Sequence, residues 1–555
     1  MRSPFLLAVA PAALAPLASA QTIQTLVLEG DSIPGVGNVS RVDNLAINDL
    51  GGWSVELDTD NADTDADSVV LREGVLYLRE GQSLAAPAGA LLDSFDALTY
   101  NDAGESLWNF FLDGTTGIFD DSGIYVGEEL LIQEGELSTA AGFTPGTSYV
   151  GFFETKIDDL GSAVVLATVD DPAISSTVDQ AFVRLFFDTA GQLGAEVVLQ
   201  KEGDVLPGQT ESVNTFGTNP HQFAWSDNGQ LMFFADLTGD SATDGVIYLG
   251  GVLLAQEGAP SPVAGRSWSS LSSPELDLTD FGSYVFSGSL SGDSSSNLLI
   301  VRDGLKFRQE GDTLPAIGAG NAFTSFGSGP LRISNAGDVL WYGDWDDPNT
   351  DTDTGLFLND ELLVQEGVTS IGGVLIDNLR GIQDGYALSE NGRYVLFEAE
   401  LEGSTDGLFL IDRAHGMERV DACTALNAAE LDYWSGGTSI GDTLVLALSG
   451  AASPGDPALL GLATGPAPSF PPCGLPIAGI GEILIDVLPP FPLVIPVGAA
   501  GVPSQPPTAA PLSIPNNASL VGSEVWLQGG FLDLFDVDPS TVLRLSNAQK
   551  VVIQA

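Results

Sequence analysis

The sequence has few basic residues: 18 lysines and arginines stand against 75 aspartates and glutamates, for a net charge of −57. A chain this acidic is repelled by nucleic acid and by anionic membrane surfaces. Histidine occurs twice and cysteine twice in 555 residues. Any Ser-His-Asp or Cys-His arrangement would need His221 or His415, and neither has a recognisable motif around it. Two histidines and two cysteines that are expected to form a disulfide also exclude a conventional zinc site.

Helix-forming and membrane-spanning patterns are missing as well. Methionine occurs three times, whereas glycine and proline occur 66 and 32 times, a composition typical of short strands and many turns. The most apolar stretch beyond the N-terminus, residues 483–497, contains Asp486 and four prolines, which excludes a spanning helix. Because 44% of the residues are hydrophobic, we expect the acidic side chains to coat a folded core.

The N-terminus has the pattern of a secretory signal peptide. Arg2 precedes an apolar stretch, residues 5–17, and then the sequence Ala18-Ser19-Ala20. A signal anchor is the alternative, but Pro11 and Pro16 interrupt the apolar stretch, which is short for a bilayer span. We therefore predict cleavage after Ala20 and a secreted or cell-surface protein.

A repeat runs through most of the chain. An apolar strand ends in Glu-Gly seven times, at Glu29-Gly30, Glu80-Gly81, Glu134-Gly135, Glu202-Gly203, Glu257-Gly258, Glu310-Gly311 and Glu366-Gly367. Between these marks lie glycine-containing polar turns: residues 48–51, 101–104, 158–161, 226–229, 279–282, 334–337 and 389–392. Asn, Asp and Gly tolerate the positive φ that tight hairpins require, so each turn is predicted to join two antiparallel strands.

The spacing of these marks predicts a β-propeller. Each unit reads as four antiparallel strands, and the period of roughly fifty-odd residues falls in the range of propeller blades and related repeat units. The longest unit is explained by a surface-loop insertion around residues 170–190. The seventh unit lacks its Glu-Gly strand, and we predict that the strand ending at Glu29 completes it and closes the ring. An open β-solenoid is the competing architecture, but its coils are usually much shorter.

Residues 422–555 form a second predicted module, after residues 21–421 of the propeller. The Glu-Gly pattern stops there, and short apolar runs alternate with Pro-rich loops, as in a small antiparallel β-sandwich. Cys423 and Cys473 lie in this module, and two cysteines in an exported chain most often form a disulfide.

The C-terminal module also resembles a known kind of domain. Residues 441–555, with Ile514-Pro515-Asn516, Leu520-Val521-Gly522 and Leu545-Ser546-Asn547, are similar to a C-terminal module on secreted proteins of planctomycete-type bacteria. The Glu-Gly-Asp marks followed by proline, as at Glu29 to Pro34, resemble exported repeat proteins from the same kind of source. The resemblance implies export and a β-rich fold. It implies no reaction.

Two acidic loops are the candidate ligand-binding feature. They contain Asp58, Asp60, Asp63, Asp65 and Asp67 in one loop, and Asp346, Asp347, Asp351 and Asp353 in the other. Ca²⁺ takes six to eight oxygen ligands, which such loops can supply, although neither loop matches the EF-hand pattern. The alternative is a solvated acidic loop. Calcium is thus a hypothesis, and the sequence requires no cofactor.

The leading functional hypothesis is a non-enzymatic extracellular binding or scaffold protein. Its ligand would be a polysaccharide, an envelope protein or a metal-bridged neighbour. Trp268, Trp345 and Trp434 are candidates for stacking on sugars, although packing in the core is the commoner fate of tryptophan. One alternative is a carbohydrate-active enzyme that uses Asp or Glu at the propeller funnel. Another is a purely structural envelope protein. We expect a funnel filled by apolar and small residues, and the sequence contains no phosphate-binding or dinucleotide-binding motif.

Overall fold

The computed structural model describes residues 22–172, 179–271, 273–382, 384–471, 473–478, 480–487, 493–501, 505–533 and 543–555. The predicted signal peptide, residues 1–20, lies outside the described residues. The described chain is all-β: its helical elements are three 3₁₀ turns, η1 (Ser294–Ser296), η2 (Pro315–Ile317) and η3 (Ala518–Leu520). None of its helices is long and apolar enough to cross a membrane.

The first three antiparallel sheets follow one another along the chain, and each has four or five strands. The first contains β2 (Ser32–Ile33), β3 (Gly37–Ile47), β4 (Trp53–Thr59), β5 (Ser68–Arg72) and β6 (Val75–Arg79). The second contains β7 (Leu91–Tyr100), β8 (Ser106–Asp113), β9 (Ser122–Val126) and β10 (Glu129–Gln133). The third contains β11 (Ser148–Ile157), β12 (Ser162–Asp170), β13 (Gln180–Phe187) and β14 (Leu193–Lys201).

In the next three sheets two short segments replace the single innermost strand, and both pair with the second strand. The fourth contains β15 (Val213–Phe216), β16 (Phe223–Trp225), β17 (Leu231–Leu237), β18 (Gly245–Leu249) and β19 (Val252–Gln256). The fifth contains β20 (Trp268–Ser270), β21 (Leu276–Leu278), β22 (Tyr284–Leu290), β23 (Leu298–Arg302) and β24 (Leu305–Gln309). The sixth contains β25 (Phe323–Ser325), β26 (Arg332–Ile333), β27 (Val339–Trp345), β28 (Thr354–Leu358) and β29 (Glu361–Gln365).

The seventh of the described sheets joins the two ends of the repeat region. It contains β30 (Ser370–Ile371), β31 (Val374–Leu379), β32 (Tyr386–Leu388), β33 (Tyr394–Leu401), β34 (Thr405–Asp412) and the N-terminal strand β1 (Ile23–Leu28). Strand β1 pairs antiparallel with β34, with Ile23 opposite Ile411 and Leu28 opposite Gly407. The prediction that the strand ending at Glu29 completes the last unit is therefore confirmed.

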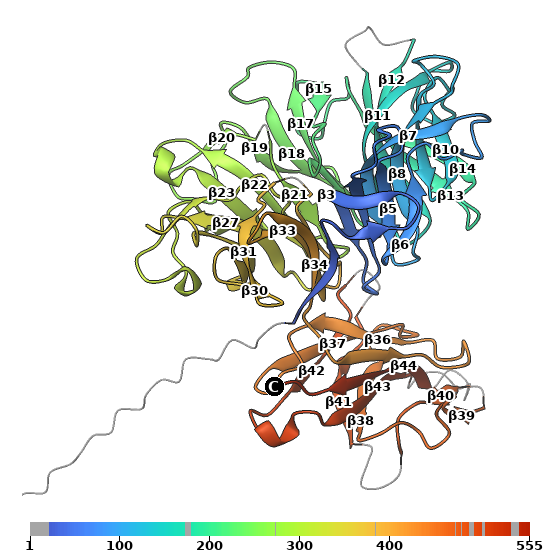
Figure 1. The fold of residues 1–555 in the computed structure, drawn as a ribbon, viewed down its shortest axis with the longest axis vertical. Helices are drawn as coiled ribbons and strands as arrows, with labels where there is room; N and C mark the ends of the chain where they lie inside the picture. The colour runs from blue at the N-terminus through green and yellow to red at the C-terminus, as the bar shows by residue number, and fades with distance from the viewer. Residues whose placement is uncertain are drawn as a thin grey trace, which may run out of the picture.

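Contacts between innermost strands run around a closed cycle. Strand β3 contacts β7, β7 contacts β11, and the series continues through β16, β21, β26 and β32 back to β3. Apolar clusters fill the spaces between adjacent sheets, such as the one that combines Val165 with Ile124 of the preceding sheet. Figure 1 shows these sheets as one body, coloured from blue to brown.

The Glu-Gly marks have a structural role, as predicted. The Glu80 carboxylate accepts hydrogen bonds from the backbone N–H groups of Asp67 and Ser68, at 3.0 and 3.1 Å, where strand β5 begins. Glu310 does the same for Asn297 and Leu298 in the fifth sheet. Gly81 has φ +76°, and a Cβ there would lie 2.8 Å from the Asp65 carbonyl oxygen, so the position requires glycine.

The expected loop insertion in the third unit is in part a strand. Residues 180–187 form β13, and β14 has nine residues where the outer strands of most other units have five. A longer β13–β14 hairpin thus accounts for much of the extra length.

The C-terminal module contains two packed sheets and a small hairpin. One sheet has the order β35 (Met417–Val420), β44 (Leu543–Val552), β43 (Glu524–Leu532), β38 (Pro457–Ala463) and β41 (Leu493–Ala499). The other has β36 (Glu430–Ser435), β37 (Thr443–Ser449) and β42 (Thr508–Ser513), and the hairpin is β39 (Leu475–Ile477) with β40 (Gly481–Ile483). One apolar cluster joins the two sheets, with Leu446 from one and Leu460 from the other.

Two predictions about this module concern the residue at which it begins and the pairing of its cysteines. Strand β35 belongs to its sheet, so the module begins a few residues before the expected boundary at 421. The predicted disulfide is confirmed: Cys423 and Cys473 are bonded, with their Cα atoms 5.5 Å apart.

Closure by β1 makes a specific prediction about stability. Val27 is 3% exposed and lies opposite Leu408 in β34. Val27→Asp should destabilise the fold by ~3 kcal/mol or more, because it buries an unpaired charge in the seam. Gln24→Asp, at an exposed position of the same strand, is the matched control and should leave the thermal unfolding midpoint within a degree or so of the wild type. Equal unfolding midpoints for the two variants would show that the pairing of β1 with β34 does not contribute to the stability of the fold.

Candidate functional site

The seven predicted turns meet around one axis and are hydrogen bonded to one another. The second residue of each turn is acidic or an amide: Asp49, Asp102, Asp159, Asp227, Asp280, Asn335 and Glu390. In five successive steps the backbone N–H of one such residue donates to the side-chain oxygen of the next, from Asp49 to Asp102 (2.7 Å), Asp159 (2.8 Å), Asp227 (2.9 Å), Asp280 (2.8 Å) and Asn335 (3.0 Å).

The last turn closes this cycle in a different way. The Asn335 N–H donates to the Glu390 carbonyl oxygen, and the Asn391 N–H donates to the Asp49 carboxylate at 2.7 Å. We call these seven residues, from Asp49 to Glu390, the carboxylate ring. Hairpin turns were predicted at these positions, but the sequence analysis did not single out their second residues, although an acid or amide recurs there in every unit.

The carboxylate ring concentrates negative charge. Carboxylate oxygens of Asp227, Asp280 and Glu390 lie within 4.8 Å of one another. Burial, followed by the neighbouring carboxylates, raises the pKa of Asp102 to about 7 and that of Asp227 to about 8. The same causes raise the pKa values of Asp49 and Glu390. At neutral pH the ring therefore holds some of its acids protonated.

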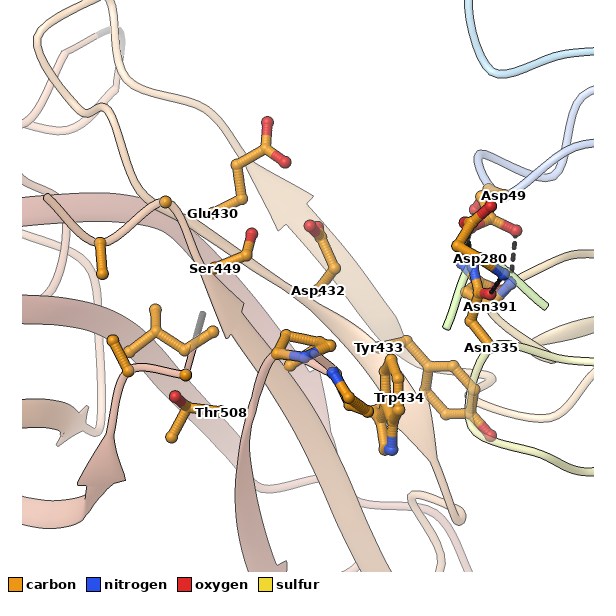
Figure 2. A pocket seen from close by; sticks show the side chains of 18 of the residues that line it. Asp49, Asp280, Asn335, Asn391, Glu430, Asp432, Tyr433, Trp434, Ser449 and Thr508 are labelled. Carbon is orange, nitrogen blue, oxygen red and sulfur yellow. Dashed lines mark hydrogen bonds between the residues drawn. The ribbon is translucent and has the colours of Figure 1, made fainter. Parts of the chain in front are cut away.

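A large cleft separates the carboxylate ring from the C-terminal module. Its volume is about 1090 Å³, and Asp49, Asp102 and Asp280 line one side. Strand β36 of the module lines the other side with Glu430, Asp432 and Trp434. Figure 2 shows Glu430 and Asp432 on one side and Asp49 and Asp280 on the other, with Trp434 between them.

Aromatic residues connect the two sides of the cleft. The Trp434 ring lies 6.0 Å from the ring of Phe281, the third residue of the fifth turn. Leu50, the equivalent residue of the first turn, is 64% exposed and also lines the cleft. Of the three tryptophans predicted to stack on sugars, Trp434 lines the cleft, whereas Trp268 and Trp345 are 3% and 1% exposed. Both of these side chains pack in the core between sheets, which is the alternative expected for tryptophan, so neither can stack on a sugar.

The axial channel beyond the ring is charged, which contradicts the expected apolar funnel. It contains a cavity of about 170 Å³, lined partly by small residues such as Ala46 and Ala224 and partly by Lys156, Asp277 and Arg332. The charged residues were missed because they differ from one unit to the next, so the repeat pattern does not show them.

His221 spans the channel between sheets that are not neighbours. Its Nε2 lies 2.9 Å from Asp384 Oδ1 in the seventh unit, and its Nδ1 lies 2.9 Å from Arg332 Nη2 in the sixth. Burial and Arg332 lower the pKa of His221 to about 4, so the imidazole is neutral and donates from Nε2. His221 and Asp384 both have positive φ, at 64° and 61°, which is costly for these residues. The expected structural role of His221 fits this position.

The aspartates of the two predicted calcium loops are not part of the carboxylate ring, and several accept hydrogen bonds from their own loop or from a neighbouring segment. Asp60 accepts hydrogen bonds from the Asn38 backbone and side chain, at 2.6 and 2.9 Å. Asp58 accepts from Ser68, Asp346 from the Ala322 backbone and Asp347 from the Asn349 backbone. Asp63 accepts weakly from the Asp65 backbone N–H at 3.5 Å, and the Asp67 and Asp351 N–H groups donate to Glu80 and Asn349. Among the described residues, these loops bring no three carboxylates within 4.8 Å, and calcium binding stays a prediction.

The chain belongs to the family described as "Family of unknown function (DUF7453)". The model of this family matches residues 16–249 and 185–407. No curated protein matches the chain. Solved structures with low similarity include the WD40 domain of SCAP from fission yeast, at 10% identity and a TM-score of 0.27, over 96% of this chain and 95% of that one. Trypanosoma rangeli sialidase with the inhibitor DANA is also similar, at 10% identity, a TM-score of 0.28, and coverage of 96% and 93%.

A third similar structure is the α-L-arabinofuranosidase Arb93A from Fusarium graminearum, at 9% identity and a TM-score of 0.28, over 71% of this chain and 98% of that one. Likenesses at these TM-scores carry no argument about activity.

The carboxylate ring predicts that stability depends on pH. A carboxyl group whose pKa is higher in the folded state than in the unfolded state stabilises the fold at low pH and loses that contribution as pH rises. For Asp227 the loss extends from about pH 4, the unfolded value, to about pH 8. Asp227→Asn keeps the oxygen that accepts the Asp159 N–H, as Asn335 does for Asp280. It should stabilise the protein by ~1 kcal/mol at about pH 8.5, after allowance for solvent screening, and much less at about pH 5.

Asn335→Asp is the opposite change and the control. It places a further carboxylate where the Asn335 amide now donates to Asp280 at 2.9 Å. Denaturant unfolding at the two pH values should show destabilisation that grows with pH. A pH-independent effect for both variants would mean that charge repulsion in the ring does not limit stability.

Proposed function

We propose that residues 22–412 form a seven-bladed β-propeller in an exported, non-enzymatic binding protein, and that the cleft beside the carboxylate ring is its ligand site. Three closures support the propeller: the pairing of β1 with β34, the cyclic contacts of the inner strands, and the hydrogen bond from Asn391 to Asp49. The signal-peptide pattern and the disulfide support export.

The observation that carries the binding proposal is the composition of the cleft. One cavity of about 1090 Å³ combines the aromatic ring of Trp434, the exposed side chain of Leu50 and several carboxylates. Ligand sites are concave, form preferentially between domains, and join apolar surface to a few oriented polar groups. The volume slightly exceeds the usual range for small ligands, so the cleft suits a segment of an extended polymer.

Binding by the full-length mature chain tests this proposal. Trp434→Ala should abolish or weaken at least tenfold the capture of immobilised glycans or envelope fractions, because it removes the largest aromatic surface of the cleft. Phe119→Ala is the matched control, since Phe119 is 72% exposed and does not line the cleft. Binding should be measured in calcium and in EDTA, which also tests the two acidic loops. Retained capture by Trp434→Ala would place the site elsewhere, and no capture by the wild type would favour a purely structural envelope protein.

A carbohydrate-active enzyme is the second candidate, and one observation favours it. Asp96 and Asp384 line the same channel cavity with pKa values shifted in opposite directions. Burial and then Glu154 raise the pKa of Asp96 to about 6, whereas the hydrogen bond from His221 and the charge of Arg332 lower the pKa of Asp384 despite burial. One carboxyl group with a raised pKa beside another with a lowered pKa is the arrangement of the acid and the base in glycosidases.

Hydrolysis assays separate this candidate from binding. If the channel is catalytic, release of reducing ends from polysaccharide should fall at least a hundredfold in Asp96→Asn and remain normal in Trp434→Ala assayed at saturating substrate. We expect no release above background from the wild type. Turnover that depends on Asp96 would overturn the non-enzymatic proposal.

A further inference from the structure

Most of the charged residues that line the cleft are acidic. Six acids line it, Asp49, Asp102, Asp280, Asp421, Glu430 and Asp432, against the two bases Arg393 and Arg419. Both arginines are already paired. Arg393 binds Asp412 through two nitrogens, at 2.8 and 3.0 Å, and Arg419 contacts Asp421 and Asp432, each at 2.8 Å. The charge left for a ligand to meet is therefore negative.

Individual acceptors in the cleft have unused capacity. Asp102 Oδ1 accepts the Asp49 N–H, but no described residue donates a hydrogen bond to its Oδ2. Glu430 has its nearest cation, Arg419, at 3.8 Å, beyond hydrogen-bond distance, and its side chain is 60% exposed. These two carboxylates lie on opposite sides of the cleft, one on the propeller and one on β36.

A buried amide that lines the cleft provides an independent indication of a ligand. Gln549, on β44, is 1% exposed, and its Nε2 donates to the Leu431 carbonyl oxygen at 2.6 Å. That bond fixes the amide with Oε1 as the other terminus, and Oε1 is buried without a hydrogen-bond partner among the described residues. A buried acceptor left unpaired costs about 1–3 kcal/mol, so a donor from outside the chain would be favoured there.

We propose that the cleft binds a cationic peptide segment of another envelope protein, with lysine or arginine side chains between the carboxylate ring and β36. The inference rests on the proposed function and specifies its ligand. Ammonium and guanidinium groups carry donors without acceptors, which matches the unused acceptors of Asp102, Glu430 and Gln549. The Trp434 ring offers a face for a cation, an interaction that is strongest with tryptophan. The hydroxyl groups of a neutral glycan accept hydrogen bonds as well as donate them, so a surface that offers mainly acceptors satisfies them less well than it satisfies a cation.

Fluorescence polarisation with labelled octalysine and the full mature chain tests the proposal. The measurement is made at about pH 8, where Asp102, with a pKa of about 7, is ionised and lysine is charged. Salt at about 0.15 M screens the diffuse attraction of the acidic surface. The Asp102→Asn/Glu430→Gln double variant should bind octalysine at least tenfold more weakly, since it loses two charge-assisted contacts. Octalysine acetylated on every side chain should not bind.

A matched variant distinguishes the cleft from the general surface charge. Glu211→Gln/Asp240→Asn also removes two negative charges, but at exposed positions that do not line the cleft. This variant should bind octalysine like the wild type. Asp102→Asn keeps the acceptor for the Asp49 N–H, and thermal unfolding midpoints no lower than that of the wild type show that both double variants are folded. Equal weakening in both, or no weakening in either, would show diffuse attraction and overturn the proposal.

A neutral oligosaccharide, cellohexaose, completes the experiment. Binding of cellohexaose without octalysine binding would overturn the cationic ligand and leave the proposed binding function in place. If the wild type binds neither probe, the cationic-peptide proposal is wrong, and the test with Trp434→Ala and envelope fractions decides the broader function separately.

Discussion

The closed cycle of hydrogen bonds between turns is the interaction on which the rest of the structure depends. A backbone N–H at the second position of a turn needs an acceptor, and in five successive steps the second residue of the neighbouring turn provides it with a side-chain oxygen. The acceptors are acidic in most units, so the same bonds that align the sheets also gather carboxylates at one end of the channel. Alignment of the sheets and the negative charge therefore have one origin in the sequence.

The C-terminal module gives this charged end a second wall. Strand β35 continues directly from the last sheet of the repeat region and pairs with β44, so the chain enters the module without a long linker. Arg393 reinforces the junction by donating to the Met417 carbonyl oxygen at 2.8 Å and by pairing with Asp412. The module is held beside the ring, with Trp434 against Phe281, and the cleft follows from this placement.

Features encoded within a few residues could be predicted from the sequence. The Glu-Gly marks and the turns gave the strand order of each unit, because glycine at positive φ and short polar turns have local requirements. The cysteine pair was found for a similar reason, since few cysteines leave few pairings. The pairing of β1 with the last unit could be predicted because that unit lacks one strand in the sequence.

Features that depend on distant contacts could not be predicted in this way. The bond from Asn391 to Asp49 joins opposite ends of the repeat region, and the His221–Asp384 contact crosses the channel. Trp345 and Trp434 have similar polar surroundings in the sequence, yet one lies in the core and the other in the cleft. Lys156 and Arg332 occupy channel positions where three other units have alanine, so the repeat pattern did not show them.

Hydrogen exchange of the full mature chain, measured by mass spectrometry with and without an envelope fraction, tests the central claim most directly. The account predicts slower exchange in residues 430–435 and in the turns around Asp49 and Asp280, which form the two walls of the cleft. Protection confined to the channel residues around Asp96 and Asp384, with no change at β36, would contradict it.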